Sequence, residues 1–296
     1  MVIGQTTLPE SESIGACASG RWRYIALYYA IACGISWTIW TPAVVGQQGL
    51  KLLRIAPSGP VIISLGTLGP FVAAFVTHRL ESGNWRPVRL FPVNKLRLLW
   101  FVLGPALVVF CMFVVFPALI SKGSPETWNW HPGVLAGIFV PMFNYNLLGG
   151  PLFEEFGWRG FLQTRLQDAV PSWIAAISVG AMWAAWHWPL FFVHGFTSVS
   201  PAVFLMILIG LSMVMAFGFN ASGKAVIAAI LMHSAFNSSP RFLNAYLGSV
   251  STRLYPSAGL LIAISFLSVG TLLTILTRGR LAAKRAWKIG DGRDVS

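Results

Sequence analysis

The chain has 296 residues, of which 55% are apolar and 10% are charged, whereas soluble domains carry about 25% charged residues. A soluble fold of this length could not bury so much apolar surface, so the composition excludes a soluble globular protein. The net charge of +12 is compatible with a nucleic-acid partner, but the basic residues form no stripe interleaved with aromatic residues. We therefore expect a membrane protein whose partner is the lipid bilayer, and no binding of nucleic acid.

Long uncharged runs predict an all-α protein with about eight transmembrane helices in a single domain, residues 1–296. Runs such as 98–121 and 202–222 contain no charged residue, and they reach the roughly 20 residues that a helix needs to cross the hydrocarbon core. The predicted spans, in chain order, are Tyr24–Val45, Val61–Thr77, Leu98–Ile120, Val134–Leu166, Ser172–Val193, Ala202–Phe219, Ala225–Leu247 and Ser257–Thr277. The fourth span contains Gly149-Gly150-Pro151, where we expect a bend or a break.

The basic residues predict how these spans are oriented in the membrane. If the N-terminus is inside, sixteen of the 21 lysines and arginines flank the inner ends of the spans and five flank the outer ends. Basic residues accumulate on the cytoplasmic side of membrane proteins. We therefore expect a multi-pass integral membrane protein with both termini in the cytoplasm. Its basic cytoplasmic tail, residues 279–296, is expected to lie on the membrane surface.

Two adjacent carboxylates inside the fourth predicted span are the first candidates for a functional site. An ionised side chain in hydrocarbon is costly, and it is retained where it is paired or used. Of the nine acidic residues, only Glu154 and Glu155 fall inside a predicted span. Glu155 and Arg159 are four residues apart and share a helix face, whereas Glu154 points about 100° away. A structural ion pair would account for Glu155 and Arg159, and it leaves Glu154 available for chemistry.

Two later spans carry the polar side chains that we expect to meet Glu154. His187 lies in the fifth span, and His233 and Asn237 are four residues apart on one face of the seventh. If the fourth and fifth spans form a hairpin that turns at residues 168–171, Glu154 lies about 21 Å and His187 about 24 Å from that turn, at 1.5 Å per residue. The two side chains are therefore expected at a similar depth, in the cytoplasmic half of the bundle or near its middle.

Three motifs thus occur in order on successive predicted helices: Glu154-Glu155-x-x-x-Arg159, Trp183-x-x-x-His187 and His233-x-x-x-Asn237. Together they resemble the CAAX prenyl protease and bacteriocin-processing family of intramembrane proteases (CPBP, also called Abi). The resemblance covers about Gly150–Asn237, inside a motif-bearing core of about residues 133–247. One position departs from the family pattern, since Trp183 stands where the family usually has phenylalanine.

The resemblance implies an eight-helix fold and an endopeptidase that cleaves a peptide bond close to the membrane surface. It implies that Glu154 and His187 activate a water molecule and that His233 and Asn237 donate hydrogen bonds to the oxyanion. The substrate would be a peptide or protein, such as a prenylated C-terminal CAAX-type peptide, a bacteriocin leader or a membrane-anchored regulator. Each of these would suit a cavity that opens to the cytoplasm.

The need for a metal ion stays open at this point. Glu154, His187 and His233 could supply the two-histidine, one-carboxylate set of a catalytic zinc, which would make the protein a metalloendopeptidase. However, the chain has no HExxH motif, and a zinc ligand role for His233 would leave Asn237 with little to do. We therefore favour water activation without an obligatory metal, with zinc as the alternative cofactor, and expect Glu155 and Arg159 to support the geometry.

Two other functions are compatible with acids and histidines inside a membrane. A proton- or cation-coupled transporter would also use Glu154, but the hydropathy shows no two-fold repeat and the break at Gly149-Gly150-Pro151 has no counterpart in the other half of the chain. A non-catalytic immunity or scaffold member of the same family is the third reading. It is disfavoured because every motif position is present.

Overall fold

The computed structural model describes residues 10–86, 88–91, 94–112, 133, 140, 143–247 and 249–284. The regular elements in these residues are all helical, which confirms the predicted all-α class. They are α1 (Glu10–Val45), α2 (Gly59–Gly66), α3 (Leu68–Ser82), η1 (Lys95–Leu99), α4 (Trp100–Phe110), α7 (Pro151–Glu155), η4 (Phe156–Gln163), α8 (Thr164–Gln167), α9 (Ser172–Trp186), η5 (Trp188–Phe192), α10 (Pro201–Ala221), α11 (Val226–Leu247) and α12 (Ser249–Leu276).

Four helical stretches in the described part of the chain are long and apolar enough to cross a membrane: Gly59–Ser82, Ser172–Phe192, Pro201–Ala221 and Ala258–Leu276. They coincide with the second, fifth, sixth and eighth predicted spans, and they confirm a multi-pass membrane protein. The first and seventh predicted spans lie in α1 and α11. Parts of the third and fourth, and residues 285–296 of the basic tail, lie outside the described residues.

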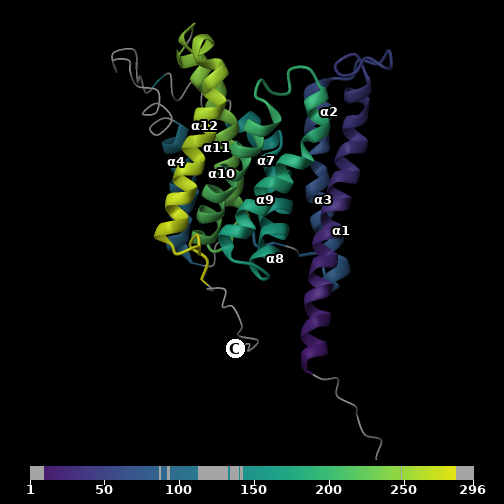
Figure 1. Ribbon diagram of the computed structural model, residues 1–296, viewed down its shortest axis with the longest axis vertical. Coiled ribbons are helices and arrows are strands. Elements are labelled where there is room, and N and C mark those ends of the chain that lie inside the picture. The colour runs from purple at the N-terminus through teal and green to yellow at the C-terminus, as the bar shows by residue number, and fades with distance from the viewer. Residues whose placement is uncertain are drawn as a thin grey trace, which may run out of the picture.

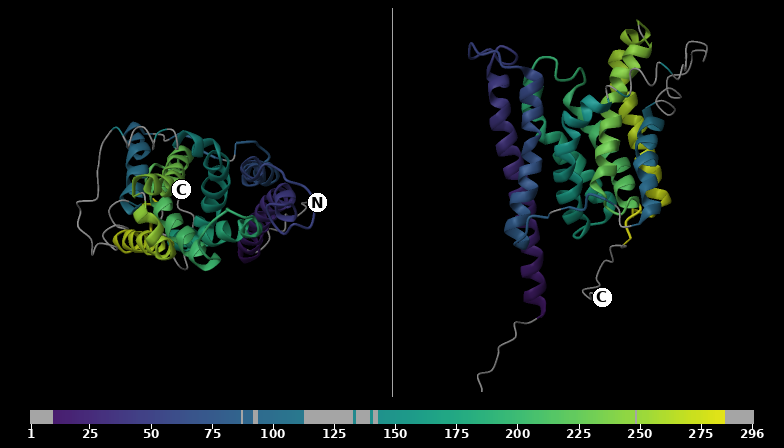
Figure 2. Two further views of the ribbon diagram at one scale, coloured as in Figure 1. Left: turned by 90° about the horizontal axis from the view of Figure 1, so that it is seen from above. Right: turned by 180° about the vertical axis from the view of Figure 1, so that it is seen from behind.

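The helices are arranged in two groups around a central hairpin. In Figures 1 and 2, α1, α2 and α3 form one side of the molecule, α4, α10, α11 and α12 form the other, and α7, α8 and α9 lie between them. The closest packing joins α10 to α12 and to α9, α1 to α3, and α11 to α4. The start of α1, the turn between α8 and α9 and the end of α12 lie at the same end of the bundle (Figure 1), which we call the terminal end.

Glycines allow three of the core helices to approach one another closely. A Cβ atom at Gly180 of α9 would lie 2.7 Å from Cα of Ile209 on α10, and one at Gly210 of α10 would lie 2.6 Å from the backbone nitrogen of Leu267 on α12. Small residues at helix contacts are the usual means of packing helices in a membrane, where apolar side chains gain little by leaving lipid. The backbones of α9, α10 and α12 are therefore in direct contact.

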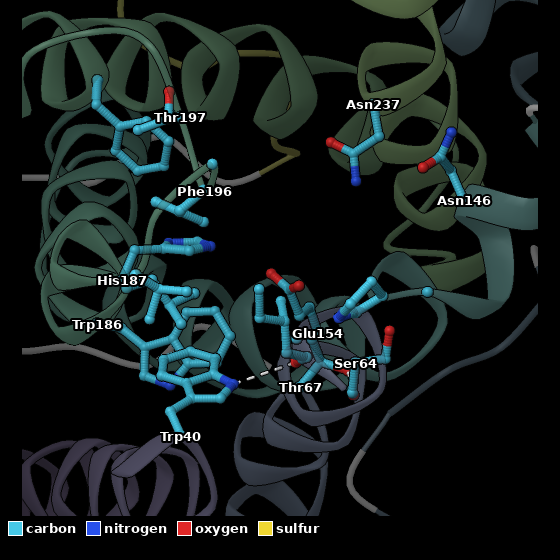
Figure 3. Close-up of a pocket in the computed structure, with 18 of the residues that line it drawn as sticks. Trp40, Ser64, Thr67, Asn146, Glu154, Trp186, His187, Phe196, Thr197 and Asn237 are labelled. Atoms are coloured by element: carbon cyan, nitrogen blue, oxygen red, sulfur yellow. Dashed lines mark hydrogen bonds between the residues drawn. The ribbon is translucent and has the colours of Figure 1, made fainter. Parts of the chain in front are cut away.

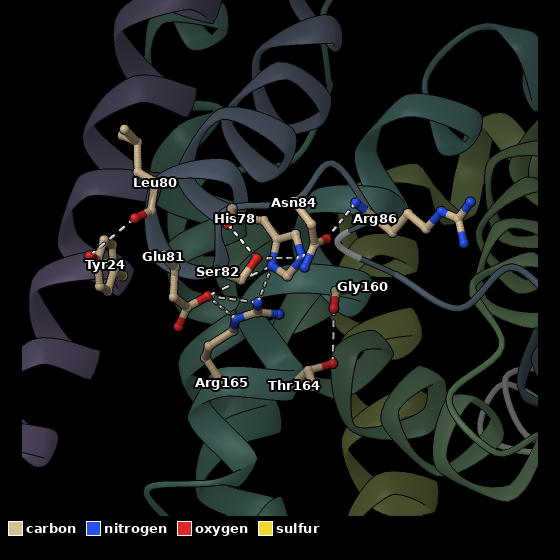
Figure 4. A network of polar contacts seen from close by, with 10 residues as sticks. All are labelled: Tyr24, His78, Leu80, Glu81, Ser82, Asn84, Arg86, Gly160, Thr164 and Arg165. Carbon is tan, nitrogen blue, oxygen red and sulfur yellow. Dashed lines mark hydrogen bonds and ion pairs between the residues drawn. The ribbon is translucent and has the colours of Figure 1, made fainter.

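A polar network holds α3 against α8 at the terminal end (Figure 4). Arg165 donates to Oε2 of Glu81 from NH2 at 2.7 Å and from Nε at 3.1 Å. The same NH2 group lies 2.8 Å from Nδ1 of His78. Because a guanidinium can only donate, Nδ1 of His78 accepts this bond and carries no proton. At the same end, Arg21 of α1 donates to the backbone oxygen of Asp168 at 2.8 Å.

Candidate active site

A break in the chain places the two glutamates inside the bundle. The helical segment 143–148 ends in a turn at Gly149 and Gly150, and α7 begins at Pro151, so the break that the sequence predicted is present. Proline is well suited to the first turn of a helix, because the N–H that it lacks has no partner there. A Cβ atom at Gly150 would lie 2.8 Å from Oε1 of Glu154. The glycine therefore leaves room for that carboxylate.

The two adjacent glutamates point in different directions and have different partners. Glu154 is 5% exposed, and its Oε2 accepts a hydrogen bond of 2.8 Å from the indole N–H of Trp183. Glu155 is fully buried. Its Oε1 accepts from NH1 of Arg159 at 3.0 Å and from Nδ1 of His233 at 2.8 Å. The ion pair expected from the four-residue spacing is thus present, and it is shared with a histidine from α11.

The segment that follows the glutamates is a π-helix, η4, where the sequence predicted a continuous α-helix through Leu166. It packs very closely against α1 and α3, because a Cβ atom at Gly157 would lie 2.7 Å from the backbone oxygen of Pro70. π-helical turns are uncommon and occur often at functional sites. Here the π-helix carries Arg159, whose guanidinium carbon lies 4.6 Å from the ring centroid of Trp183.

His187 lies at the C-terminal cap of α9, just before the Trp188–Pro189 step that starts η5. Its Nδ1 lies 2.8 Å from the backbone oxygen of Trp183. Because a carbonyl oxygen can only accept, Nδ1 carries the proton. In the neutral ring the other nitrogen, Nε2, then has a free lone pair and can accept a proton or a hydrogen bond.

His233 and Asn237 extend from one face of α11 toward the same region. His233 is 3% exposed, and its ring meets that of Trp183 edge to face, with centroids 4.8 Å apart. Asn237 is half-buried, and its carboxamide points into the space between Glu154 and His187 (Figure 3). Trp183 therefore contacts members of all three motifs, which the sequence alone did not indicate.

These side chains surround one cavity of about 860 Å³. Its lining includes Glu154, His187, His233 and Asn237, the four residues proposed as catalytic from the sequence. Glu155 and Arg159 are not among the lining residues and lie behind it. The remaining lining includes residues that no motif marked, such as Ser64, Thr67 and Asn146 on the polar side and Trp40, Trp186, Phe196 and Phe204 on the aromatic side.

The mouth of the cavity lies at the end of the bundle opposite the terminal end. It is lined by the loop after α1, at Gln47, Gln48 and Lys51, and by the loop after η5. The termini and the mouth therefore lie at opposite ends, so the two expectations of cytoplasmic termini and of a cavity open to the cytoplasm cannot both hold. The distances of about 21–24 Å that separate Glu154 and His187 from the α8–α9 turn exceed half of a hydrocarbon core of about 30 Å.

The donor groups do not fit a three-ligand zinc site as they stand. Within the described residues, no group of three His, Cys, Asp or Glu side chains is close enough to hold a metal ion. The hydrogen bonds of His187 and His233 use Nδ1 and do not occupy Nε2, so the spacing of the side chains, and not their partners, argues against the site. We therefore derive no catalytic step through a metal.

Comparison with known proteins finds similarity for the part of the chain that carries the three motifs. Residues 136–239 match the model of the family described as type II CAAX prenyl endopeptidase Rce1-like. The chain is 25% identical over 194 residues to CAAX prenyl protease 2 of Methanococcus maripaludis, an alignment that covers 60% of this chain and 70% of that protein. The matched region contains all three motifs. These findings confirm the resemblance that the motifs predicted.

Proposed function

We propose that the protein is an intramembrane endopeptidase of the CPBP type in which Glu154 and His187 activate water. The observation that carries this proposal is the convergence of Glu154, His187, His233 and Asn237 on one cavity. The name of the archaeal relative supports a C-terminal CAAX-type peptide as the first substrate to test, and leader-type processing is the second.

Water activation follows from the hydrogen bonds of the two residues. The indole N–H of Trp183 holds Oε2 of Glu154 at 2.8 Å, which leaves Oε1 to accept a proton from water. Nε2 of His187 accepts the second hydrogen of the same water. As the proton moves to Glu154, the hydroxide oxygen bonds to the scissile carbonyl carbon, and the carbonyl oxygen becomes an oxyanion.

The oxyanion is stabilised by donors on α11. The carboxamide N–H of Asn237 is one of them, and such donors are worth about 10²–10³ in rate in comparable sites. Nδ1 of His233 already donates to Glu155, so its Nε2 can donate only when both ring nitrogens carry protons. The Glu155 carboxylate accepts the bond from Nδ1 and holds the ring in place. When the C–N bond breaks, protonated Glu154 returns its proton to the leaving amine, which restores the base.

The surroundings of the buried charges support the same assignment. Glu155 is fully buried and accepts hydrogen bonds from both Arg159 and His233. A buried charge without a partner is strongly unfavourable. Glu155 is therefore the residue that holds the donors in place, while Glu154 alone faces the cavity as a base.

The test compares two Glu-to-Gln changes in purified protein in detergent. The substrates are a farnesylated peptide that ends in a Cys-a-a-X sequence and an unprenylated leader-like peptide, with the products identified by mass spectrometry. Glu154→Gln is expected to reduce cleavage by about 10²–10⁴-fold, the range for general-base catalysis. Glu81→Gln makes the same chemical change at the terminal end and should retain activity. Wild-type turnover by Glu154→Gln would show that the proposed base is wrong.

A further inference from the structure

We infer that the cavity opens to the extracytoplasmic side of the membrane and takes a peptide segment that an exported or membrane-anchored polypeptide presents on that side. This inference rests on the proposed protease function and adds the side from which the substrate arrives. It depends on two independent observations, namely the charge of the two ends of the bundle and the position of the mouth.

The terminal end is the basic end. The segments that meet there are the start of α1, the α3–α4 connection, α8, the α10–α11 turn and the residues after α12. Hydrogen bonds place them together: Val226 N–H donates to the backbone oxygen of Arg89 at 3.0 Å, and Asn220 donates to that of Leu281 at 2.9 Å. These segments carry most of the lysines and arginines in the described residues, whereas the loop at the mouth carries Lys51 and Arg54.

The excess of basic residues at the terminal end predicts the orientation of the protein in the membrane, because basic residues accumulate on the cytoplasmic side. The connections between the helices are short, which is the condition under which basic residues determine topology. A terminal end in the cytoplasm places the loops after α1 and η5 outside. A substrate that enters the cavity between these loops comes from the outside, and a peptide presented by a cytoplasmic protein would meet the basic end, opposite the mouth.

The mouth is built to accept a chain segment. The two loops that form it are joined by His194, whose backbone N–H and ring Nδ1 both donate to the backbone oxygen of Gln48, at 2.7 and 2.8 Å. One wall is aromatic, with Phe196 and Phe204, and suits an apolar side chain. Lys51 is exposed at the rim. Among the described lining residues it is the only one with a basic side chain that is always charged near neutral pH. It therefore favours an acidic group on the outer part of the substrate.

Cysteine labelling tests the orientation without reference to activity. In a background with Cys17, Cys33 and Cys111 replaced by serine, single cysteines are introduced as Ser198→Cys, exposed beside the mouth, or Asp168→Cys, exposed at the α8–α9 turn. Intact cells are treated with a membrane-impermeant maleimide, and labelling is normalised to that of denatured protein. We expect at least tenfold more labelling of Ser198→Cys, with Asp168→Cys labelled only after permeabilisation. The reverse pattern, or equal labelling of both, would overturn the inference.

Cleavage in cells tests the substrate side. The peptide that the purified protein cleaves in detergent is attached to a single-span anchor, once on the outer side and once on the inner side. Cleavage of the outer fusion alone, abolished by Glu154→Gln, is the expected result. Cleavage of the inner fusion alone would overturn the inference and leave the protease proposal intact. Absence of any cleavage in detergent would instead refute the protease function, whatever the labelling shows.

Discussion

Replacing Trp183 by phenylalanine tests whether its indole N–H positions the catalytic base. The ring would still lie over Arg159 and against His233, and the backbone oxygen would still accept from His187, so the change removes chiefly the 2.8 Å bond to Glu154. Hydrogen bonds to charged groups contribute about 1.5–3 kcal/mol. We use the lower value because water in the cavity can replace the donor. If this amount is lost from the transition state, kcat falls about tenfold.

The assay is steady-state cleavage of the model peptide in detergent, with thermal unfolding followed in parallel. We expect the change in kcat with a KM within about twofold of the wild type, since the carboxylate acts on water and not on the bound peptide. Trp158→Phe is the matched control. Trp158 is equally buried, its indole nitrogen has no hydrogen-bond partner in the described residues, and it does not line the cavity. A Trp183→Phe protein that keeps at least half of the wild-type kcat would refute the positioning role.

Four further results are expected. Glu155→Gln leaves Arg159 and His233 without their shared carboxylate and should lower stability by about 3–5 kcal/mol, with partial recovery in a Glu155→Gln/Arg159→Met double variant; equal melting temperatures of wild type and Glu155→Gln would contradict this. Asn237→Ala should reduce kcat about 10²–10³-fold, and unchanged kcat would remove Asn237 from the oxyanion site. Glu81→Gln should lower the free energy of unfolding by no more than about 1 kcal/mol, because its pair with Arg165 is partly exposed; a larger loss in denaturation would show that the terminal network is essential. Treatment with a strong zinc chelator should leave cleavage unchanged, and loss of activity restored by added zinc would show metal dependence.

The parts of this molecule that could be predicted are those with a local signal. The scarcity of intramembrane acids identified Glu154 and Glu155, and the four-residue spacing predicted the ion pair with Arg159 that the structure contains. The helix break was predictable because Gly149-Gly150-Pro151 contains both a proline and two glycines. The catalytic roles of these residues stay predictions, and so does the cytoplasmic position of the termini.

The parts that could not be predicted depend on contacts between distant segments. The π-helix at Phe156–Gln163 could not be predicted, because the spacing of apolar residues in this segment does not distinguish a π-helix from an α-helix. The hydrogen bond from Trp183 to Glu154 joins residues 29 positions apart, so spacing within a helix says nothing about it. The position of the mouth relative to the termini could not be predicted, because it depends on which loops line the cavity, at Gln48 and His194, and neither loop carries a motif.

The contacts of Glu155 and Trp183 also determine which parts of the protein can move during turnover. Glu155 joins α7 to α11 through His233, and Trp183 joins α9 to α7 through Glu154. Opening the bundle between these helices would break buried charge-assisted bonds, each a substantial fraction of a typical folding free energy. The loops at the mouth are held by bonds from His194 to a single backbone oxygen near the surface. Substrate entry and product release are therefore expected to proceed by local displacement of these loops, while the three helices that carry the catalytic groups stay fixed relative to one another.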